Sequence, residues 1–402
     1  MAGPLSHIRV LDLSRIMAGP WSGQILADLG ADVIKVERTG EGDDTRRWGP
    51  PYLKGADGNA TKESGYYLSV NRGKRSVEVD ISTPAGQEVI RALAKTSDIL
   101  LENFKSGTLA RYGLGYEDLK AINPGLIYCS ITGFGTTGPK QADVAYDFMI
   151  QAMGGLMSVT GERDGVPGGG PQKVGVPIVD IMTGMYATIA VLAALARRSQ
   201  SGVGDFIDIA MLDVSVAMLA NQAMNYQVSG RTPIRRGNKH PNIQPQDVFP
   251  VADGHIVLAV GNDEQFRRFA EVQGRPEWAD DPRFSTNAAR VTHLDILHPM
   301  ICERFATQPL QYWLEHLGAA KVPCGPINTI PMVFEEPQVK HREMLRHLPH
   351  PIAGTVPQVV SPMRFTNAPL AFEKAPPLLG QHTLEILNEL GLATKMDKVG
   401  RA

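Results

Sequence analysis

The chain has 402 residues, of which 43% are hydrophobic and 20% are charged. This length exceeds what a single hydrophobic core usually organises, so we expect a large domain and a smaller one. The 40 Lys and Arg residues nearly balance the 42 Asp and Glu residues, and the net charge is -2. The chain as a whole therefore has no electrostatic footprint for nucleic acid or an anionic membrane.

The cysteines and the N-terminus indicate a protein of the reducing cytoplasm. Cys129, Cys302 and Cys324 are odd in number and far apart, which fits neither a disulfide framework nor a zinc site. The first residues lack the basic and apolar regions of a secretory signal, and the longest apolar stretch, 185–196, is too short to span a bilayer. We therefore expect no membrane partner. The ten histidines contain no H-x-x-x-H pair, so we also expect no metal site.

Strand-like and helix-like segments alternate along the first part of the chain. Apolar, β-branched runs predict strands at 7–14, 31–38, 76–82, 98–103 and 126–135, and helical patterns lie at 21–30 and 84–97. Such alternation predicts a parallel sheet with ligands near the carboxyl ends of its strands. Helical sequence then dominates residues 147–158 and 180–228.

The character of the sequence changes after residue 228. Residues 230–254 are rich in Gly, Pro, Asn and basic residues and predict a long loop, after which 255–261 reads as a strand and 262–274 as a helix capped by Asn262 or Asp263. We expect an α/β protein with a Rossmann-like large domain at 1–222, a smaller α/β domain at 223–330, and a segment at 331–402 that returns to the large domain. The proline-rich text at 349–380 predicts a chain that runs over a surface.

Several common site motifs are missing. There is no G-x-x-x-x-G-K-[ST] and no G-x-S-x-G, which leaves a P-loop or a serine hydrolase without support. "GFGTTG" (133–138) fits G-x-G-x-x-G and follows a strand, but no clear helix follows it, so it does not indicate dinucleotide binding. Basic residues do recur near predicted strand ends, where together they could bind phosphates. Each one taken alone is more simply interpreted as a solvent-exposed surface residue. They are Arg38, Lys74, Arg75, Lys105 and Arg111.

A series of phrases in fixed order carries a resemblance to a known family. The sequence resembles the class III coenzyme A transferases, the CaiB/BaiF family, over nearly the whole chain. Within the family it is most similar to succinyl-CoA:glutarate transferase-like members, through "GEGDDTRRWGPP" and "VPCGPINTIPMVFEEPQV". The phrases that carry the family likeness are "DLSRIMAGP", "GADVIKVER", "NRGKRS", "ENFKSG", "ITGFGTTGP", "AYDFMIQAMGG", "VPIVDIMTG", "GNKHPNIQP" and "PPLLGQHT".

The resemblance implies a transfer of CoA from an acyl-CoA thioester to a free carboxylic acid, with an aspartate as nucleophile. The matching residue is Asp180, which on local sequence would be an ordinary N-cap of the helix that follows it. Attack by the carboxylate gives a mixed anhydride and then an aspartyl-CoA thioester. The resemblance further implies a CoA thioester as substrate, no permanently bound cofactor, and an interlocked homodimer.

The same likeness assigns further site residues. Those that resemble CoA contacts are Arg38, Arg75, Asn103, Phe104, Lys105 and Arg111, with Phe134 and Tyr146 lining the thioester end. A glycine-containing lid that supplies oxyanion donors corresponds to Gly237, Asn238, Asn242 and Gln244. The chain departs from the family pattern at Met17, where relatives carry a glutamine, and at Gln246 and Asp247, where they read Tyr-Gln.

Two other functions compete with CoA transfer. An α-methylacyl-CoA racemase or epimerase needs a second acid/base group, for which relatives use the His of a Gly-His-Asp motif, whereas this chain has Ala145, Tyr146 and Asp147. Tyrosine is a poor base at neutral pH, which favours the transferase. The other alternative is a CoA-binding module without turnover, against which the retained Asp180 argues.

The basic residues near the lid bear on the acyl acceptor. They could hold the distal carboxylate of a dicarboxylic acid, in agreement with a succinyl- or glutaryl-type substrate, or simply form a solvated basic loop. These residues are Arg231, Arg235, Arg236, Lys239 and His240.

Overall fold

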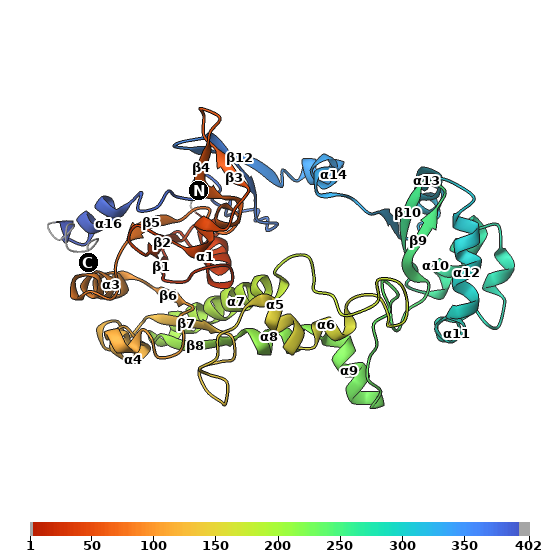
Figure 1. Cartoon of the computed structure of the whole chain (residues 1–402), viewed down its shortest axis with the longest axis horizontal. Helices are drawn as coiled ribbons and strands as arrows, with labels where there is room; N and C mark the ends of the chain where they lie inside the picture. Colours follow the sequence, from red (N-terminus) through yellow and green to blue (C-terminus); the bar gives the residue numbers. More distant parts are fainter. Residues whose placement is uncertain (1–2, 394–402) are drawn as a thin grey trace. The chain divides into compact units, whose positions relative to one another are not determined.

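The computed structural model describes residues 3–393, and the chain forms two compact units (Figure 1). The larger unit comprises residues 3–156, 174–220 and 338–393, and the smaller one 157–173 and 221–337. The sequence predicts domain boundaries after residues 222 and 330. The units of the structure divide after residues 220 and 337. The smaller unit also takes 157–173, which we had expected in the large domain. Residues 1–2 and 394–402 of the predicted large domain lie outside the described part.

A six-stranded parallel sheet forms the centre of the larger unit. Its strand order is β5-β2-β1-β6-β7-β8, with every neighbouring pair parallel. This is the doubly wound order of Rossmann folds, in which the direction of winding reverses between the first strand and its neighbour. The predicted α/β class is confirmed. The strands are β1 (Arg9–Asp12), β2 (Asp32–Glu37), β5 (Arg75–Glu78), β6 (Ile99–Glu102), β7 (Ile127–Thr132) and β8 (Asp205–Ala210).

Helices cover both faces of this sheet because each central strand is apolar on both sides. On β1, Leu11 faces a core formed with α3, α4 and α16, and Val10 faces a second core formed with α1 and α7. The helices of the unit are α1 (Ala18–Asp28), α2 (Gly65–Leu68), α3 (Pro84–Thr96), α4 (Tyr116–Ile122), α5 (Asp147–Met153), α7 (Ile178–Ser201), α8 (Met211–Met218) and α16 (Thr383–Glu389), with the 3₁₀ turns η1 (Asp44–Arg47) and η2 (Ala110–Tyr112).

The helical stretch predicted at 180–228 is wrong at its centre. Residues 205–210 form β8, the edge strand that pairs with β7 from Ile127↔Asp205 to Thr132↔Ala210. The exposure of its residues alternates, as in a half-exposed strand, but the sequence "DFIDIA" does not alternate apolar and acidic residues, so it carries no clear strand period. The helix that follows, α8, leads to α9 (Ala220–Ser229).

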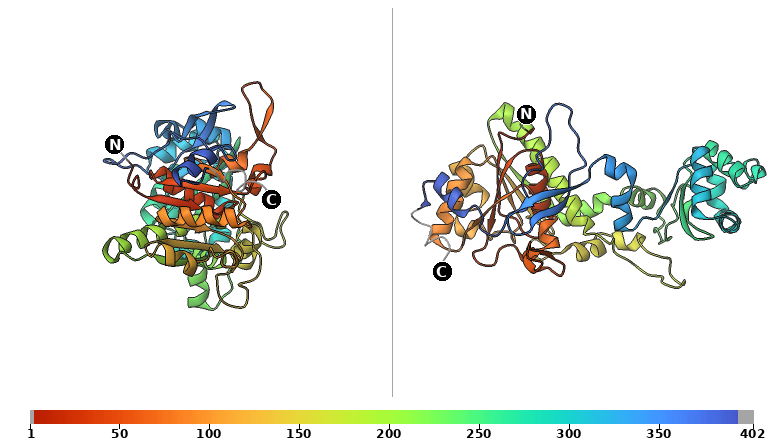
Figure 2. Two further views of the ribbon diagram at one scale, coloured as in Figure 1. Left: turned by 90° about the vertical axis from the view of Figure 1, so that its left-hand side faces the viewer. Right: turned by 90° about the horizontal axis from the view of Figure 1, so that it is seen from above.

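The C-terminal segment, from residue 338, belongs to the larger unit. The amide of His382 donates to the carbonyl of Ser76 on β5 (2.9 Å), and α16 packs beside that strand. Both views of Figure 2 show this segment, in blue, alongside the N-terminal strands, in red. Two antiparallel pairs complete the unit, namely β3 (Tyr52–Lys54) with β4 (Ala60–Ser64) and β12 (Leu345–His350) with β13 (Gly354–Val359).

The smaller unit has an antiparallel sheet of order β11-β10-β9 with its own aromatic core. Part of the loop predicted at 230–254 is therefore strand, because residues 246–251 pair with β10. The predicted cap is confirmed, since Asn262 Oδ1 accepts from the amide of Gln265 (2.8 Å). The elements are β9 (Gln246–Val251), β10 (Gly254–Ala259), β11 (Cys324–Pro326), α10 (Asp263–Val272), η3 (Pro276–Ala279), α11 (Asn287–Thr292), α12 (Leu294–Phe305), α13 (Leu310–Ala319) and α14 (Ile330–Glu335), while α6 (Leu156–Val159) and α15 (Pro337–His341) lie at the boundaries.

Helix α7 is longer than the apolar stretch that predicts it. It spans 24 residues and, by length and composition alone, is the one helix among residues 3–393 that could cross a membrane. In the fold it is a core helix, because Ala187, Val191 and Ala194 pack on the sheet and the helix runs against α1. Packing thus explains the apolar residues on this face of the helix.

Arg46 joins the sheet to the returning C-terminal segment. Its guanidinium donates to Glu37 (2.7 and 2.8 Å), Glu63 (2.9 Å) and the carbonyl of Pro377 (3.0 Å), and it lies 3.7 Å from the ring centre of Tyr67. Removing one partner of a buried ion pair leaves an uncompensated charge.

We predict that Arg46→Met destabilises the protein by about 3–5 kcal/mol, because two buried carboxylates lose their partner. Urea unfolding measures the change. Arg38→Met is the matched control, since this guanidinium is 73% exposed in its pair with Glu41 and such pairs contribute about 0–1 kcal/mol. Equal effects of the two substitutions would contradict the prediction.

Candidate active site

Asp180 lies in the first turn of α7, and a carboxylate from another helix holds that turn. Pro177 precedes the helix and offers no side-chain cap. Instead, the amides of Val179 and Asp180 donate to Oδ2 of Asp147 at 2.8 and 3.1 Å. The first residue of α5 therefore satisfies two of the free amides at the start of α7.

An apolar cluster fixes the same two helices beside the end of β7. Buried Ile150 and Val179 pack with Met211, and Phe134 and Ala145 pack against them. The predicted thioester-end residue Phe134 thus shares a cluster with the start of α7. Tyr146, predicted beside it, precedes Asp147 and is 60% exposed.

The surroundings of Asp180 disfavour its charge. Burial, and secondarily the charge of Asp147, raises the pKa of the Asp180 carboxyl from 3.8 to about 7. Tyr66 belongs to the same site, because burial, followed by the charges of Asp180 and Asp147, raises the pKa of its phenol to about 12. The ring of Tyr66 meets Trp48 edge-on, 5.1 Å between centres. The sequence analysis missed Tyr66, and its short helix α2 offers no local signal for it.

The crevice where winding reverses lies between the carboxyl ends of β1 and β6. The side chain of Asn103 joins the loop after β6 to the loop after β1. It accepts from the amide of Arg15 (2.8 Å) and donates to the carbonyl of Arg15 (2.7 Å). The Arg15 guanidinium lies 5.7 Å from the ring centre of Phe104 and pairs with Asp44. Arg15 is a further cation at this position that the sequence analysis missed, although its place directly after the first strand was a usable signal.

The other expected CoA contacts divide into exposed and enclosed groups. Lys105 and Arg111 are exposed, and Arg38 is exposed and pairs with Glu41. Arg75 is instead enclosed by three carboxylates, those of Asp32, Glu385 and Glu389 at 2.6–2.8 Å. Lys74 is fully buried and donates to Asp12, Pro20 and Asn71. Both cations are thus bound by partners within the protein.

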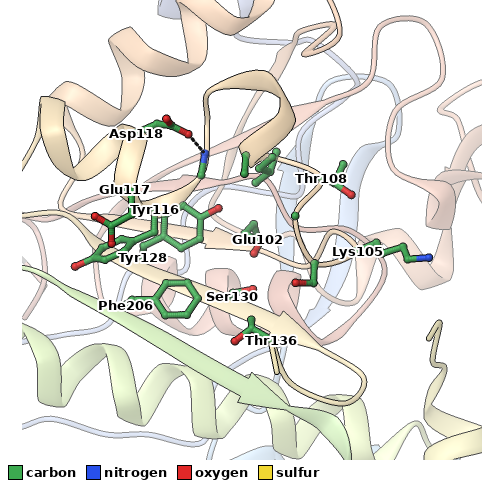
Figure 3. A pocket seen from close by; sticks show the side chains of 15 residues that line it. Glu102, Lys105, Thr108, Tyr116, Glu117, Asp118, Tyr128, Ser130, Thr136 and Phe206 are labelled. Carbon is green, nitrogen blue, oxygen red and sulfur yellow. Dashed lines mark hydrogen bonds between the residues drawn. The ribbon is translucent and has the colours of Figure 1, made fainter. Parts of the chain in front are cut away.

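A hollow of about 270 Å³ lies under the loop that carries Lys105. Figure 3 shows Tyr116, Tyr128 and Phe206 together on one side of it and Lys105 on the other. Its floor contains Glu102, whose pKa burial raises to about 7. The hollow adjoins the predicted CoA loop but lies on the side of β7 and β8.

The predicted lid belongs to the smaller unit. Gly237 adopts a φ of +62°, a left-handed conformation that favours glycine, and a Cβ there would displace the Glu162 carboxylate. Asn242 exchanges hydrogen bonds with Asn225, and Gln244 is buried and donates to the carbonyl of His240 (2.6 Å). Asn238 is exposed. The amides of Asn242 and Gln244 are thus engaged within the unit.

The five cations near the lid are not equivalent. Arg235 pairs with Asp164, and Lys239 pairs with Asp247 (3.3 Å). Nδ1 of His240 accepts from two backbone amides, at 3.1 Å each. Arg231 and Arg236 are exposed.

We predict that Asp180→Asn stabilises the protein, increasingly so as the pH rises. The pKa of Asp180 in the folded protein lies above its ordinary value, so its ionisation opposes folding; this penalty grows between about pH 4 and 7 and levels off above 7. Thermal unfolding from pH 5 to 8 measures the difference between variant and parent. Asp143→Asn, at an exposed carboxylate, is the control, and a difference that shrinks with rising pH would contradict the prediction.

Comparison with known proteins gives a consistent result over the whole chain. Residues 5–383 match the sequence model of CoA-transferase family III. The chain is 49% identical over 391 residues to the succinate--glutarate CoA-transferase of Agrobacterium fabrum, covering 96% of each protein. It is 41% identical to the succinyl-CoA:glutarate CoA-transferase of Homo sapiens, covering 96% of this chain and 86% of that protein.

A solved structure agrees in fold. The crystal structure of a CaiB/BaiF family protein from Brucella suis superposes with a TM-score of 0.85 at 47% identity, over 97% of this chain and 100% of that one. The resemblance inferred from the sequence motifs is confirmed. The chain belongs to CoA-transferase family III, the CaiB/BaiF family, and is a CoA-transferase.

Proposed function

We propose that this enzyme moves CoA from a succinyl-CoA-like thioester to a free dicarboxylic acid, with Asp180 as the nucleophile. The observation that carries the proposal is the half-buried carboxylate of Asp180 in the first turn of α7, with its raised pKa, next in sequence to Val179, which belongs to the same apolar cluster as Phe134. A carboxylate with a raised pKa is a stronger nucleophile than an ordinary one and remains a competent leaving group. The names of the two similar transferases, both acting with glutarate, support the substrate class.

The proposed reaction needs no proton shuttle. One oxygen of Asp180 attacks the thioester carbonyl, a C–O bond forms, and the C–S bond breaks to release CoA thiolate. The thiolate then attacks the aspartyl carbonyl of the mixed anhydride and releases the donor acid as a carboxylate. The acceptor carboxylate reverses these two steps, and each addition creates an oxyanion that nearby donors must stabilise.

The residues we propose for CoA follow the crevice between β1 and β6. Asn103 and Phe104 lie in it, Arg38, Lys105 and Arg111 present exposed cations nearby, and we add Arg15. We leave Arg75 out, because three carboxylates already bind its guanidinium. Phe134 and Tyr146 would line the thioester end.

For the lid we propose Asn238 as the oxyanion donor in preference to Asn242 and Gln244, whose side-chain amides are engaged. Gly237 would permit the turn of the lid, since its own amide already donates to the carbonyl of Gly161 (3.1 Å). By the same reasoning, Arg231 and Arg236 are the lid cations available to a distal carboxylate, since Arg235 and Lys239 already have carboxylate partners. CoA enters as a substrate, and we place the reaction in the cytoplasm.

We predict that the purified enzyme converts succinyl-CoA and glutarate to glutaryl-CoA, and that Asp180→Asn lowers the rate at least about 10³-fold, because the nucleophile is lost. Mass spectrometry of a matrix of acyl-CoA donors against mono- and dicarboxylates measures both. Asp143→Asn should retain full activity.

Three outcomes would contradict parts of this proposal. Undiminished turnover by Asp180→Asn would exclude the nucleophile. A preference for monocarboxylates would exclude the dicarboxylate class. Binding of CoA without transfer to any acceptor would favour a binding module, whereas hydroxylamine trapping of a modified Asp180 under donor alone would support the covalent route.

We further propose that the enzyme works as an interlocked homodimer. A groove of about 810 Å³ on the larger unit is lined by apolar side chains of α1, α7 and β13, including Ile25, Ile189 and Val359. Ile189 is 59% exposed and Val359 55% exposed. Soluble chains rarely leave so large an apolar surface open to water, and a second copy would cover it.

We predict that sedimentation gives the mass of two chains and that Ile189→Glu shifts the population towards single chains, because a charge in this groove opposes burial. Ile296→Glu, at an exposed residue of α12, is the control. A parent protein that sediments as one chain at micromolar concentration would overturn the dimer.

A further inference from the structure

Asp147 and Asp180 form a pair of carboxylates at the junction of α5 and α7. Oδ2 of Asp147 accepts from the amides of Val179 and Asp180, and its Oδ1 accepts from Nε2 of Gln151 at 2.5 Å. Gln151 is fully buried, and its Oε1 accepts from the amide of Val174 (2.9 Å). Asp147 therefore has one fixed orientation, set by three donors.

This orientation removes the stabilisation that a helix start normally gives to an acidic side chain. The free amides of a first turn favour a nearby negative charge. Here Asp147 occupies the amides of Val179 and Asp180, so their partial positive charge is directed at Asp147 and away from the side chain of Asp180.

The groups that face Asp180 add no compensating cation. Among the described residues, its carboxyl responds electrostatically to Asp147 on α5, and the phenol of Tyr66 on α2 responds to both carboxylates. The cluster that packs around Val179, the residue before Asp180, is apolar and includes Phe134 and Met211. Two like charges therefore share a poorly solvated site in the resting enzyme.

We propose that Asp147 is a positioning residue that also drives acylation, by destabilising the free carboxylate of Asp180 relative to the neutral aspartyl-CoA thioester. This inference rests on the proposed nucleophilic role of Asp180. Over the two steps of acylation, the C–S bond of the donor breaks, a C–S bond to the aspartyl carbon forms, and one Asp180 oxygen is retained by the released acid. The negative charge leaves position 180 with that acid, and no proton moves.

The consequence is a thermodynamic bias towards the covalent state. Repulsion by Asp147 acts on the free Asp180 carboxylate and disappears when position 180 is acylated. The same repulsion opposes ionisation of Asp180. The ratio of thioester to free enzyme and the pKa of Asp180 therefore depend on one interaction energy and must change together. If Asp147 were only a cap, it would stabilise the helix start but would affect neither the thioester ratio nor the pKa of Asp180.

Two substitutions separate the charge from the cap. Asp147→Asn keeps a carbonyl oxygen for the two amides and removes the charge, whereas Asp147→Ala removes both. Asp213→Asn, at an exposed acid in the first turn of α8, is the matched control. Each protein is incubated with succinyl-CoA and succinate at fixed ratio, and the fraction carrying CoA on Asp180 is measured by intact-protein mass spectrometry between pH 6 and 9.

We expect Asp147→Asn to lower the equilibrium ratio of thioester to free enzyme about tenfold above pH 8 and to move the acid limb of the rate profile down by about one pH unit, because an interaction equivalent to one pKa unit is a factor of ten. Asp147→Ala should share both changes and also unfold at a lower temperature. Asp213→Asn should behave as the parent.

The possible failures are distinguishable. A folded Asp147→Asn enzyme with the parent's thioester ratio and acid limb would overturn the role of Asp147 while leaving Asp180 as the nucleophile. If the thioester ratio and the acid limb changed in Asp147→Ala but not in Asp147→Asn, Asp147 would be only a cap. Absence of any thioester on the parent enzyme would overturn the proposed function itself.

Discussion

The start of helix α7 depends on one carboxylate supplied by another helix. Pro177 has no polar side chain with which to cap this turn, so the amides of Val179 and Asp180 take Asp147 as their acceptor. Unpaired amides at a buried helix start would be costly. The contact therefore fixes α5 against α7 and, through Gln151, fixes the approach of the chain at Val174. The position of the candidate nucleophile follows from this arrangement.

A second constraint is the set of buried ion pairs beside the crevice. Lys35 pairs with Asp43 at 2.8 Å and Lys74 with Asp12 at 2.9 Å, with all four side chains fully buried. Charges so deep in a protein persist only when partners satisfy them. Lys35 also donates to the carbonyl of Ser14, and Asp43 accepts from the amide of Ile16. The loop after β1 is thus held rigidly at the edge where winding reverses.

These constraints distinguish the buried cations, which carboxylates within the protein bind, from the exposed cations, which can meet a phosphate. Along the phrase "NRGKRS", Arg72, Lys74 and Arg75 are all buried and bound by carboxylates. Cations at loop tips, such as Lys105 and Arg111, keep their heads in water. Both groups consist of Lys and Arg residues near strand ends, and residue type alone cannot separate them. Burial decides which cations can meet a phosphate.

The sequence by itself determined the α/β class, the strands β1, β2, β5, β6 and β7, the helix cap at Asn262 and, through ordered motifs, the family and Asp180 as candidate nucleophile. These features depend on local periodicity, local capping and residue identity, all of which are present in the chain. It did not reveal β8, whose six residues lie between two helices, or the roles of Asp147 and Tyr66. Only the tertiary structure decided these, because each depends on a contact between segments that are distant along the chain, and such contacts leave no period in the sequence.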